Sequence, residues 1–278
     1  MRNSPLKLPS CFEDNDYFIF LKEEDRIAVI RRDRDSEALR ICLKTPELFL
    51  SHAGILKDSR TTKASISKLE DDTPVFIKRY NNKGFLHTLK YFFKTPRAIK
   101  AFHNAWIFEA CDIPVPRAQG IVLFRHLGFT KISYLVTDTV NDSIATLDFF
   151  KMLERDSFLF VKFTETVLAY LSIAHGHGLR HGDMKMSNIF CRKSQDGYSF
   201  GFWDLDGATF TGKPLSRKRR AAELARLISS YIEIGRRLSI ELPIHETSEH
   251  FIPIYEKLSK ISFRRDEIIP GIEKFLNR

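Results

Sequence analysis

The sequence predicts an α+β protein of two lobes, with a sheet-rich N-terminal lobe over residues 1–142 and a mainly helical C-terminal lobe over residues 143–278. Two observations lead to this prediction. The first half holds short runs of aromatic and β-branched residues, broken by charged or glycine-containing turns, which is typical of antiparallel strands. After the polar segment at 141–146, apolar residues recur with a helical period. We expect a ligand cleft between the lobes.

In the N-terminal lobe, the alternating runs predict three antiparallel hairpins, at 17–30, 65–80 and 120–140. A single helix is predicted at about 97–111, where four large residues fall near one face: Ile99, Phe102, Trp106 and Cys111. The prolines of IPVP, at 113–116, end this helix because proline cannot continue the hydrogen-bond ladder.

In the C-terminal lobe, a helix is predicted at about 157–176. Its apolar stripe has spacings of 3, 4, 4 and 3 and consists of Phe160, Phe163, Val167, Leu171 and Ala174. A glycine-broken loop and a short hairpin ending in YSFGFWD follow. From about residue 216 the chain reads as helices interrupted at Pro243, Pro253 and Pro270.

The formal charge of +9 indicates an anionic partner, although charge alone does not say which kind. Basic residues gather in two stretches: Lys83, Lys90, Lys94, Arg97 and Lys100 in the first, and Arg217 to Arg220 in the second. Either stretch could equally be a solvated helix face. The first ten residues lack the apolar core of a signal peptide, and no window resembles a membrane span, so we expect a cytoplasmic protein with free cysteines.

The residues that suggest chemistry are HGDMKMSN, at 181–188, and WDLD, at 203–206. Phosphoryl transfer needs a carboxylate that accepts the proton of the attacking hydroxyl, and oxygen ligands that hold magnesium against the phosphates. Asp183 is the candidate base, and Asn188, in the same loop, is a candidate magnesium ligand. Lys185 could neutralise the charge that develops on the transferred group. Asp204, at the end of the following hairpin, is the second candidate magnesium ligand.

HGDMKMSN resembles the catalytic loop of protein-kinase-like enzymes, and WDLD resembles their Asp-Phe-Gly segment. PVFIKRY, at 74–80, is similar to their nucleotide-binding strand, which implies that Lys78 contacts the α and β phosphates of ATP. The motifs together are similar to those of the lipopolysaccharide core kinases, the heptose and Kdo kinases, over roughly residues 55–230. The resemblance implies a protein-kinase-like bilobal fold, ATP and Mg²⁺ as cofactors, and a core glycolipid as acceptor, most simply at a heptose.

The sequence departs from the kinase pattern in three places. No glycine-rich loop precedes the lysine strand, so backbone amides and three hydroxyls would cover the phosphates: Ser59, Thr61 and Thr62. The acid that pairs with Lys78 is Glu109, the acid of the predicted helix, or some other acid, or none, because related kinases carry theirs about where Ala101 stands. Asp206 replaces the glycine of Asp-Phe-Gly and is a second metal ligand or a loop-stabilising carboxylate.

Several alternatives stay open at this point. A cluster of three histidines, His175, His177 and His181, permits a metal site, although bracing of the catalytic loop by His181 is the preferred interpretation. An aminoglycoside- or choline-type kinase would share the HGD loop but would need an acidic pocket. A nucleotide-binding pseudokinase is the third reading. The basic stretches favour an anionic glycolipid and the anionic inner-membrane surface as partners, and no nucleic acid is expected.

Overall fold

A computed structural model describes residues 9–50, 54–81, 95–126, 129–195 and 197–277. The chain divides into two compact units. The first comprises the N-terminal region up to Ile107 together with Pro116–Thr139, and the second contains Phe108–Val115 and the chain from Val140 onward. Lys83, Lys90 and Lys94 of the first basic stretch lie outside the described residues.

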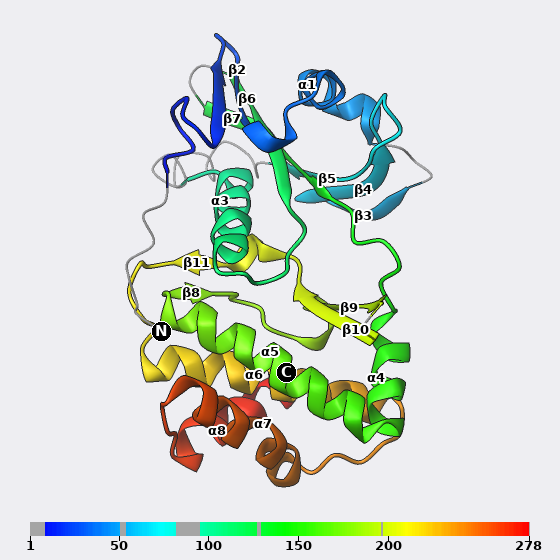
Figure 1. Cartoon of the computed structure of the whole chain (residues 1–278), viewed down its shortest axis with the longest axis vertical. Coiled ribbons are helices and arrows are strands. Elements are labelled where there is room, and N and C mark those ends of the chain that lie inside the picture. The colour runs from blue at the N-terminus through cyan, green and yellow to red at the C-terminus, as the bar shows by residue number, and fades with distance from the viewer. Residues whose placement is uncertain (1–8, 51–53, 82–94, 127–128, 196, 278) are drawn as a thin grey trace. The chain divides into compact units, whose positions relative to one another are not determined.

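The first unit is built on a seven-stranded antiparallel sheet with strand order β1-β2-β6-β7-β5-β4-β3 (Figure 1). Its strands are β1 (Phe18–Lys22), β2 (Arg26–Arg31), β3 (Ile55–Ser59), β4 (Thr62–Lys68), β5 (Pro74–Asn81), β6 (Ala118–His126) and β7 (Phe129–Asp138). The three predicted hairpins are confirmed as β1–β2, β4–β5 and β6–β7. The central strands β6 and β7 are buried over half of their length or more, and a shift of one residue in the pairing would exchange the side chains between the two faces of the sheet.

Helix α1 (Glu37–Lys44) lies on this sheet, against β6, and was not predicted. Ser36 caps its first turn by accepting a hydrogen bond from the Leu39 N–H at 3.1 Å. The helix buries Leu39 and Leu43 in the core of the unit. Gly120 of β6 allows the close approach, because a Cβ there would lie 2.9 Å from a Leu43 methyl group. Two 3₁₀ turns flank the helix, η1 (Arg32–Arg34) and η2 (Pro46–Phe49).

The predicted helix at 97–111 is confirmed as α3 (Arg97–Ala110). Phe102 and Trp106 pack against the ring of Phe18, with centroid distances of 5.6 and 5.2 Å. The segment that follows α3 belongs to the second unit, where the Pro114 carbonyl accepts a hydrogen bond from the Phe202 N–H at 2.9 Å.

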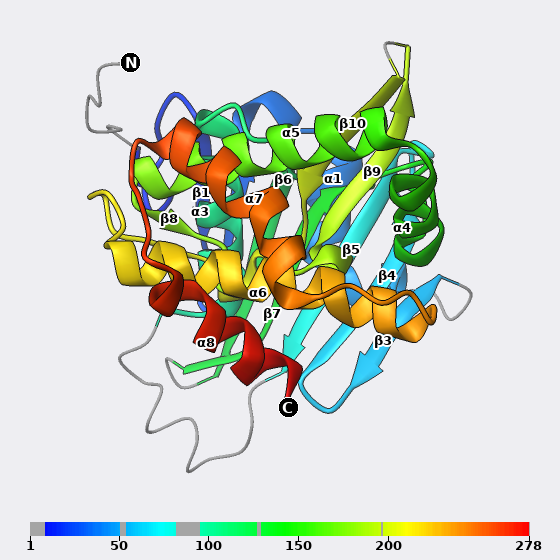
Figure 2. The ribbon, with the colours of Figure 1, turned by 90° about the horizontal axis from the view of Figure 1, so that it is seen from below.

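The second unit is mainly helical, and Figure 2 shows α7 lying beside both α5 and α6, with α8 against α6. Its helices are α4 (Thr146–Arg155), α5 (Ser157–Gly176), α6 (Arg217–Arg237), α7 (Ile244–Ser259) and α8 (Arg265–Leu276). Its strands form two small antiparallel pairs, β9 (Ile189–Ser194) with β10 (Gly197–Phe202), and β8 (Leu179–Arg180) with β11 (Thr209–Phe210). Two 3₁₀ turns, η3 (Met186–Asn188) and η4 (Leu205–Gly207), lie beside these strands.

Two of the predicted helix interruptions are wrong. Pro243 does precede α7, but Pro253 lies inside α7 and Pro270 inside α8. Each proline removes one N–H donor from its helix. The helices continue because packing of an apolar face outweighs local propensity. Buried residues lie two positions before and after each proline: Phe251 and Tyr255 in α7, and Ile268 and Ile272 in α8.

Helix α5 is the central helix of the second unit. It buries Phe163, Val167 and Leu171, and the Phe163 ring packs against Phe149 and Phe200 with centroid distances of 5.3 and 5.5 Å. Among the described residues it is also the one helix long and apolar enough to cross a membrane by length and composition alone, although Lys162 and Glu165 interrupt its apolar residues. Because its apolar side forms the core of this unit, that composition has a structural explanation.

Candidate active site

The predicted catalytic loop, residues 181–188, lies between β8 and β9 in the second unit, and its conformation requires glycine at its second position. Gly182 has a φ of +87°, and a Cβ on it would lie 2.2 Å from the Gly207 carbonyl oxygen. Side chains other than glycine rarely adopt this backbone conformation. The close contact with Gly207 therefore explains why this loop reads His-Gly-Asp.

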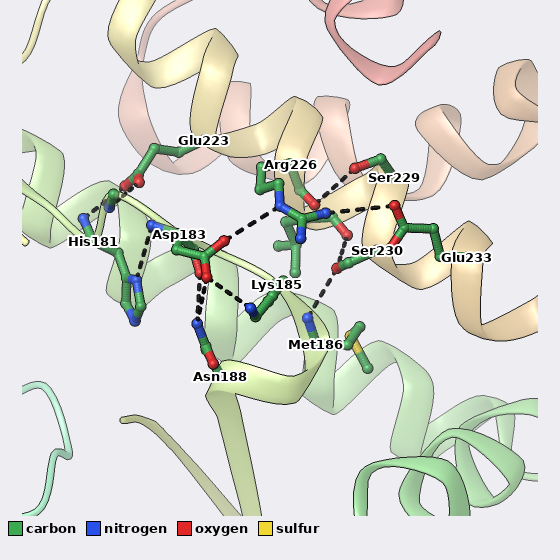
Figure 3. Close-up of polar contacts among 12 residues, drawn as sticks. His181, Asp183, Lys185, Met186, Asn188, Glu223, Arg226, Ser229, Ser230 and Glu233 are labelled. Atoms are coloured by element: carbon green, nitrogen blue, oxygen red, sulfur yellow. Dashed lines mark hydrogen bonds and ion pairs between the residues drawn. The ribbon is translucent and has the colours of Figure 1, made fainter. Parts of the chain in front are cut away.

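In this loop, Asp183 lies between two basic side chains, Lys185 of the same loop and Arg226 of α6 (Figure 3). One carboxylate oxygen is 2.7 Å from the Lys185 Nζ, and the other accepts a hydrogen bond from the Arg226 Nε at 3.4 Å. Burial raises the pKa of Asp183, but the hydrogen bond and charge of Lys185 and the charge of Arg226 outweigh that effect and lower the pKa below its ordinary value. Asp183 is thus an ionised carboxylate, able to accept a proton.

Asn188 is buried and oriented by the loop itself. Its side-chain Nδ2 donates to the Asp183 carbonyl oxygen at 2.8 Å and faces the Asp183 carboxylate at 3.3 Å. With the nitrogen engaged there, the oxygen of the amide is the end that could bind a cation.

Asp204 follows β10 and has a left-handed backbone, with a φ of 57°. Aspartate tolerates this region better than most residues, and strained conformations of this kind cluster at functional sites. The neighbouring Trp203 joins this segment to the catalytic loop, because its backbone N–H donates to the Asn188 carbonyl at 3.1 Å and its indole N–H to the Ser187 carbonyl at 2.7 Å. The hairpin and the loop that carry the two predicted magnesium ligands are therefore held together.

His181 braces this junction, as predicted. Its Nε2 is hydrogen bonded to the Trp203 carbonyl at 3.1 Å, and burial lowers the pKa of the imidazole. His175 is also buried, with its ring nitrogens 2.6 Å from the Tyr255 hydroxyl and 3.2 Å from the Glu223 carboxylate. Both contacts of His175 are within the core of the unit, so its role is structural.

Within the described residues, no group of three or more His, Cys, Asp or Glu side chains is placed to hold a metal ion. The donors present are the amide of Asn188 and the carboxylate of Asp204. Magnesium binds proteins through one or two such oxygen ligands and takes the rest from water and substrate phosphates. The donor set fits an ion shared with a nucleotide, and Asp206, half-buried in η4, could supply a further oxygen.

Glu223 of α6 is a site residue that the sequence reading missed. Its buried carboxylate accepts hydrogen bonds from the backbone N–H groups of His181, at 2.9 Å, and Gly182, at 2.6 Å. Burial raises the pKa of Glu223, but the bond from His175 and the backbone donors outweigh this and keep the carboxylate ionised. Ser230, two turns further along α6, accepts the Met186 N–H at 2.9 Å. Helix α6 thus fixes the catalytic loop at two points.

The predicted nucleotide-binding residues lie on the first unit. Lys78 is a buried residue of β5, with its Nζ 5.6 Å from the centroid of the Tyr80 ring. Ser59 closes the β3–β4 turn, since its hydroxyl donates to the Thr62 carbonyl at 2.9 Å and accepts the Thr62 N–H at 3.2 Å. Thr61 is in that turn, and its carbonyl accepts the Asn81 N–H at 3.1 Å. A two-residue turn with a side-chain brace therefore stands where kinases carry a glycine-rich loop.

Glu109 is half-buried in the last turn of α3, on the segment that belongs to the second unit. Its pairing with Lys78 stays a prediction. Ala101, the other position considered for the paired acid, is buried in α3.

The second basic stretch needs a correction, because Arg220 is not a surface residue. Its guanidinium is buried and donates to the carbonyls of Leu215 and His175 and to the Tyr255 hydroxyl. Arg217 pairs with Glu267 at 2.5 Å. Lys218 and Arg219 are the exposed residues of this stretch whose side chains form no hydrogen bond or ion pair with the described residues, so the anion-attracting surface here is smaller than the sequence suggested.

A sheet-rich unit with one main helix, followed by a helical unit carrying the His-Gly-Asp loop, defines a protein-kinase-like fold. No protein-family model and no curated protein matches the sequence. Among solved structures, WaaP in complex with acyl carrier protein is similar, with a TM-score of 0.63 and 15% sequence identity over 84% of this chain and 91% of that chain. In all, 1588 solved chains match, and a fold shared so widely does not by itself select an acceptor.

Proposed function

We propose that this protein is an ATP- and Mg²⁺-dependent kinase that phosphorylates a sugar hydroxyl of the lipopolysaccharide inner core, on a heptose. The observation that carries the proposal is the ionised carboxylate of Asp183, with Lys185 at 2.7 Å, in a loop joined to the hairpin of Asp204. The acceptor class rests on the resemblance of the sequence motifs to those of the lipopolysaccharide core kinases, and the protein-kinase-like fold that the chain shares with WaaP is compatible with it.

In the proposed reaction, Asp183 orients the acceptor hydroxyl and takes its proton as the oxygen attacks the γ-phosphorus of ATP. A new P–O bond to the sugar forms while the bond between the γ-phosphorus and the bridging oxygen breaks, and ADP leaves. Lys185, whose Nζ is 2.7 Å from the Asp183 carboxylate, would stabilise the negative charge on the transferred group. The resulting proton on Asp183 passes to solvent.

Lys78 would bind the α and β phosphates, with Glu109 orienting it, while the β3–β4 turn with Ser59, Thr61 and Thr62 would cover them. Asn188 and Asp204 would hold Mg²⁺, which screens the phosphate charge when bound. These assignments follow from the kinase resemblance, and the oxygen donors of Asn188 and Asp204 are compatible with them.

The acceptor lies on a glycolipid, so we propose a cytoplasmic enzyme that binds peripherally to the inner face of the cytoplasmic membrane. The net charge of +9 favours an anionic surface. Near such a surface each exposed Lys or Arg contributes on the order of 1 kcal/mol, an effect that salt screens. Exposed Lys218 and Arg219, and half-exposed neighbours, would take part in binding of this kind.

The test compares initial phosphorylation rates on three acceptors at matched ionic strength: a heptose-containing core fragment, a Kdo-only fragment and an aminoglycoside. We expect the heptose-containing fragment to react fastest. A preference for the aminoglycoside would reassign the protein to the small-molecule kinases, and a Kdo preference would change the acceptor sugar. Nucleotide binding with no transfer to any acceptor would indicate a pseudokinase.

A further inference from the structure

A cavity of about 410 Å³ opens beside Asp183, wholly within the second unit. The start of the catalytic loop, one side of α6 and the end of α8 form its walls. Its lining includes Arg180, Asp183, Met184, Arg226, Glu233 and Phe275. Pockets for small molecules usually measure roughly 300–1,000 Å³, so the volume suits a small ring system.

Arg226 stands at the centre of this lining, between two carboxylates (Figure 3). Its Nε is 3.4 Å from the Asp183 Oδ1, and its Nη1 is 3.6 Å from the Glu233 Oε1. Its guanidinium carbon lies over the Phe275 ring, 5.2 Å from the centroid, which is within the range of a cation–π contact. The predicted base is thereby linked through one arginine to a second acid, about two turns further along α6.

Arg180 adds a second donor to the same cavity. Its Nε is buried and has no hydrogen-bond partner among the described residues, and the Glu223 carboxylate, at 3.8 Å, is beyond hydrogen-bond distance. Glu223 is occupied by the backbone N–H groups of the catalytic loop. A buried donor of this kind is costly unless a ligand or water satisfies it.

Charged groups of both signs line the cavity, and one of its three carboxylates, that of Glu223, is already engaged by the backbone N–H groups of the loop. Asp183 and Glu233 offer acceptors, Arg180 and Arg226 offer donors, and Met184 and Phe275 add apolar surface. A cationic acceptor would face two guanidinium groups, and a polyanion would face two carboxylates. A polyhydroxylated ring matches this lining, because vicinal hydroxyls both donate and accept while the C–H faces of the ring are apolar.

We propose that this cavity is the acceptor subsite, in which Glu233 accepts from and Arg226 donates to hydroxyls next to the one that meets Asp183. The inference rests on the proposed function and adds the residues that select a neutral sugar ring. Arg226 then has two roles, since it holds Asp183 ionised and changes partner from Asp183 to the sugar when the acceptor binds. Glu233 is the specificity residue, because it does not contact Asp183.

The test uses the full-length protein, with ADP and Mg²⁺ present and no phosphoryl donor, and measures binding of a heptose-containing core oligosaccharide by calorimetry. We expect Glu233→Gln and Arg226→Lys each to weaken binding by about tenfold or more, the worth of a hydrogen bond to a charged group. ADP affinity should stay unchanged in both. The matched controls are Glu246→Gln, on the exposed surface of α7, and Arg236→Lys, at the exposed end of α6.

Steady-state kinetics with ATP provide the second readout. Glu233→Gln should raise the KM for the oligosaccharide and leave the KM for ATP unchanged. Binding by the two variants equal to wild type, or no binding of the oligosaccharide to wild type, would overturn the subsite. Tight, Glu233-dependent binding without phosphate transfer would keep the subsite and reject the kinase function, so the two failures are distinguishable.

Discussion

The catalytic loop of the second unit and the β3–β4 turn of the first unit are both proposed to contact the reactants, but they are held in different ways. The turn is braced locally, by Ser59 on Thr62, three residues away. The loop is fixed by α6, through Glu223 and Ser230, about forty residues further along the chain. These bonds, together with the one from the Asn81 N–H to the Thr61 carbonyl, tie the turn to the neighbouring strands of its own sheet. Anchoring to α6 makes the geometry of the loop depend on the packing of its whole unit.

The largest effect is expected at the base itself. Asp183→Asn keeps the size of the side chain but removes the proton acceptor, so turnover should fall by at least about two orders of magnitude. Folding, followed by circular dichroism, and ATP binding should be retained because Asn188 and Asp204 are unchanged. Turnover like that of wild type would remove Asp183 from the mechanism.

Glu223→Gln tests the anchoring of the loop. The amide can accept one of the two backbone N–H groups but must place its own NH₂ against the other, so we expect a loss of roughly 2–3 kcal/mol in the free energy of unfolding. Turnover should fall as well, because the loop backbone at His181 and Gly182 loses its support. Denaturant unfolding and kcat are the measurements, with exposed Glu246→Gln as the control. Unchanged stability would mean that α6 does not hold the loop.

Lys185→Met tests the electrostatics of the base. Burial raises the pKa of Asp183 and Lys185 lowers it, so removal of Lys185 leaves burial opposed mainly by Arg226, and the pKa rises. The base must be ionised to act, so the acid limb of the pH–rate profile should move to higher pH. The comparison covers only pH values at which both proteins are folded. A limb that stays in place would show that another group sets the ionisation of Asp183.

The smallest effect is expected at the turn. Ser59→Ala removes two hydrogen bonds within a half-exposed hairpin, so the KM for ATP should rise only about two- to fivefold while turnover at saturating ATP is retained. An effect as large as that of Glu223→Gln would show that the turn and the loop are equally critical, and the contrast between them would disappear.

Much of this architecture could be predicted because it is encoded in short patterns. Apolar residues recur about every second position in the strands of the three hairpins and about every 3.6 positions in α5. Both patterns can be recognised from residues that are close together in the sequence. The loop from His181 to Asn188 is likewise contiguous. The phosphate-binding role of Lys78, Ser59, Thr61 and Thr62, and the pairing of Glu109, stay predictions.

Glu223 and Arg226 could not be assigned from pattern alone, because their partners lie about forty residues away. The one available signal was an acid and a basic residue among the apolar positions of AAELARL, where Ala221, Leu224 and Leu227 are buried. Buried charged residues are rare unless paired, so such a position invites a search for a partner. Arg220 was predicted as part of a basic surface because it belongs to a run of four basic residues. In the structure its guanidinium is buried and donates to the carbonyls of Leu215 and His175.

The most direct test of the central claim is the position of the phosphate in the product. Wild-type protein and Asp183→Asn are incubated with ATP, Mg²⁺ and a heptose-containing core oligosaccharide, and a phosphorus–proton NMR correlation locates any new ester. We predict a phosphate monoester on a heptose ring with the wild-type protein and none with the variant in the same time. An ester on another sugar, equal product from both proteins, or no ester at all would contradict the account.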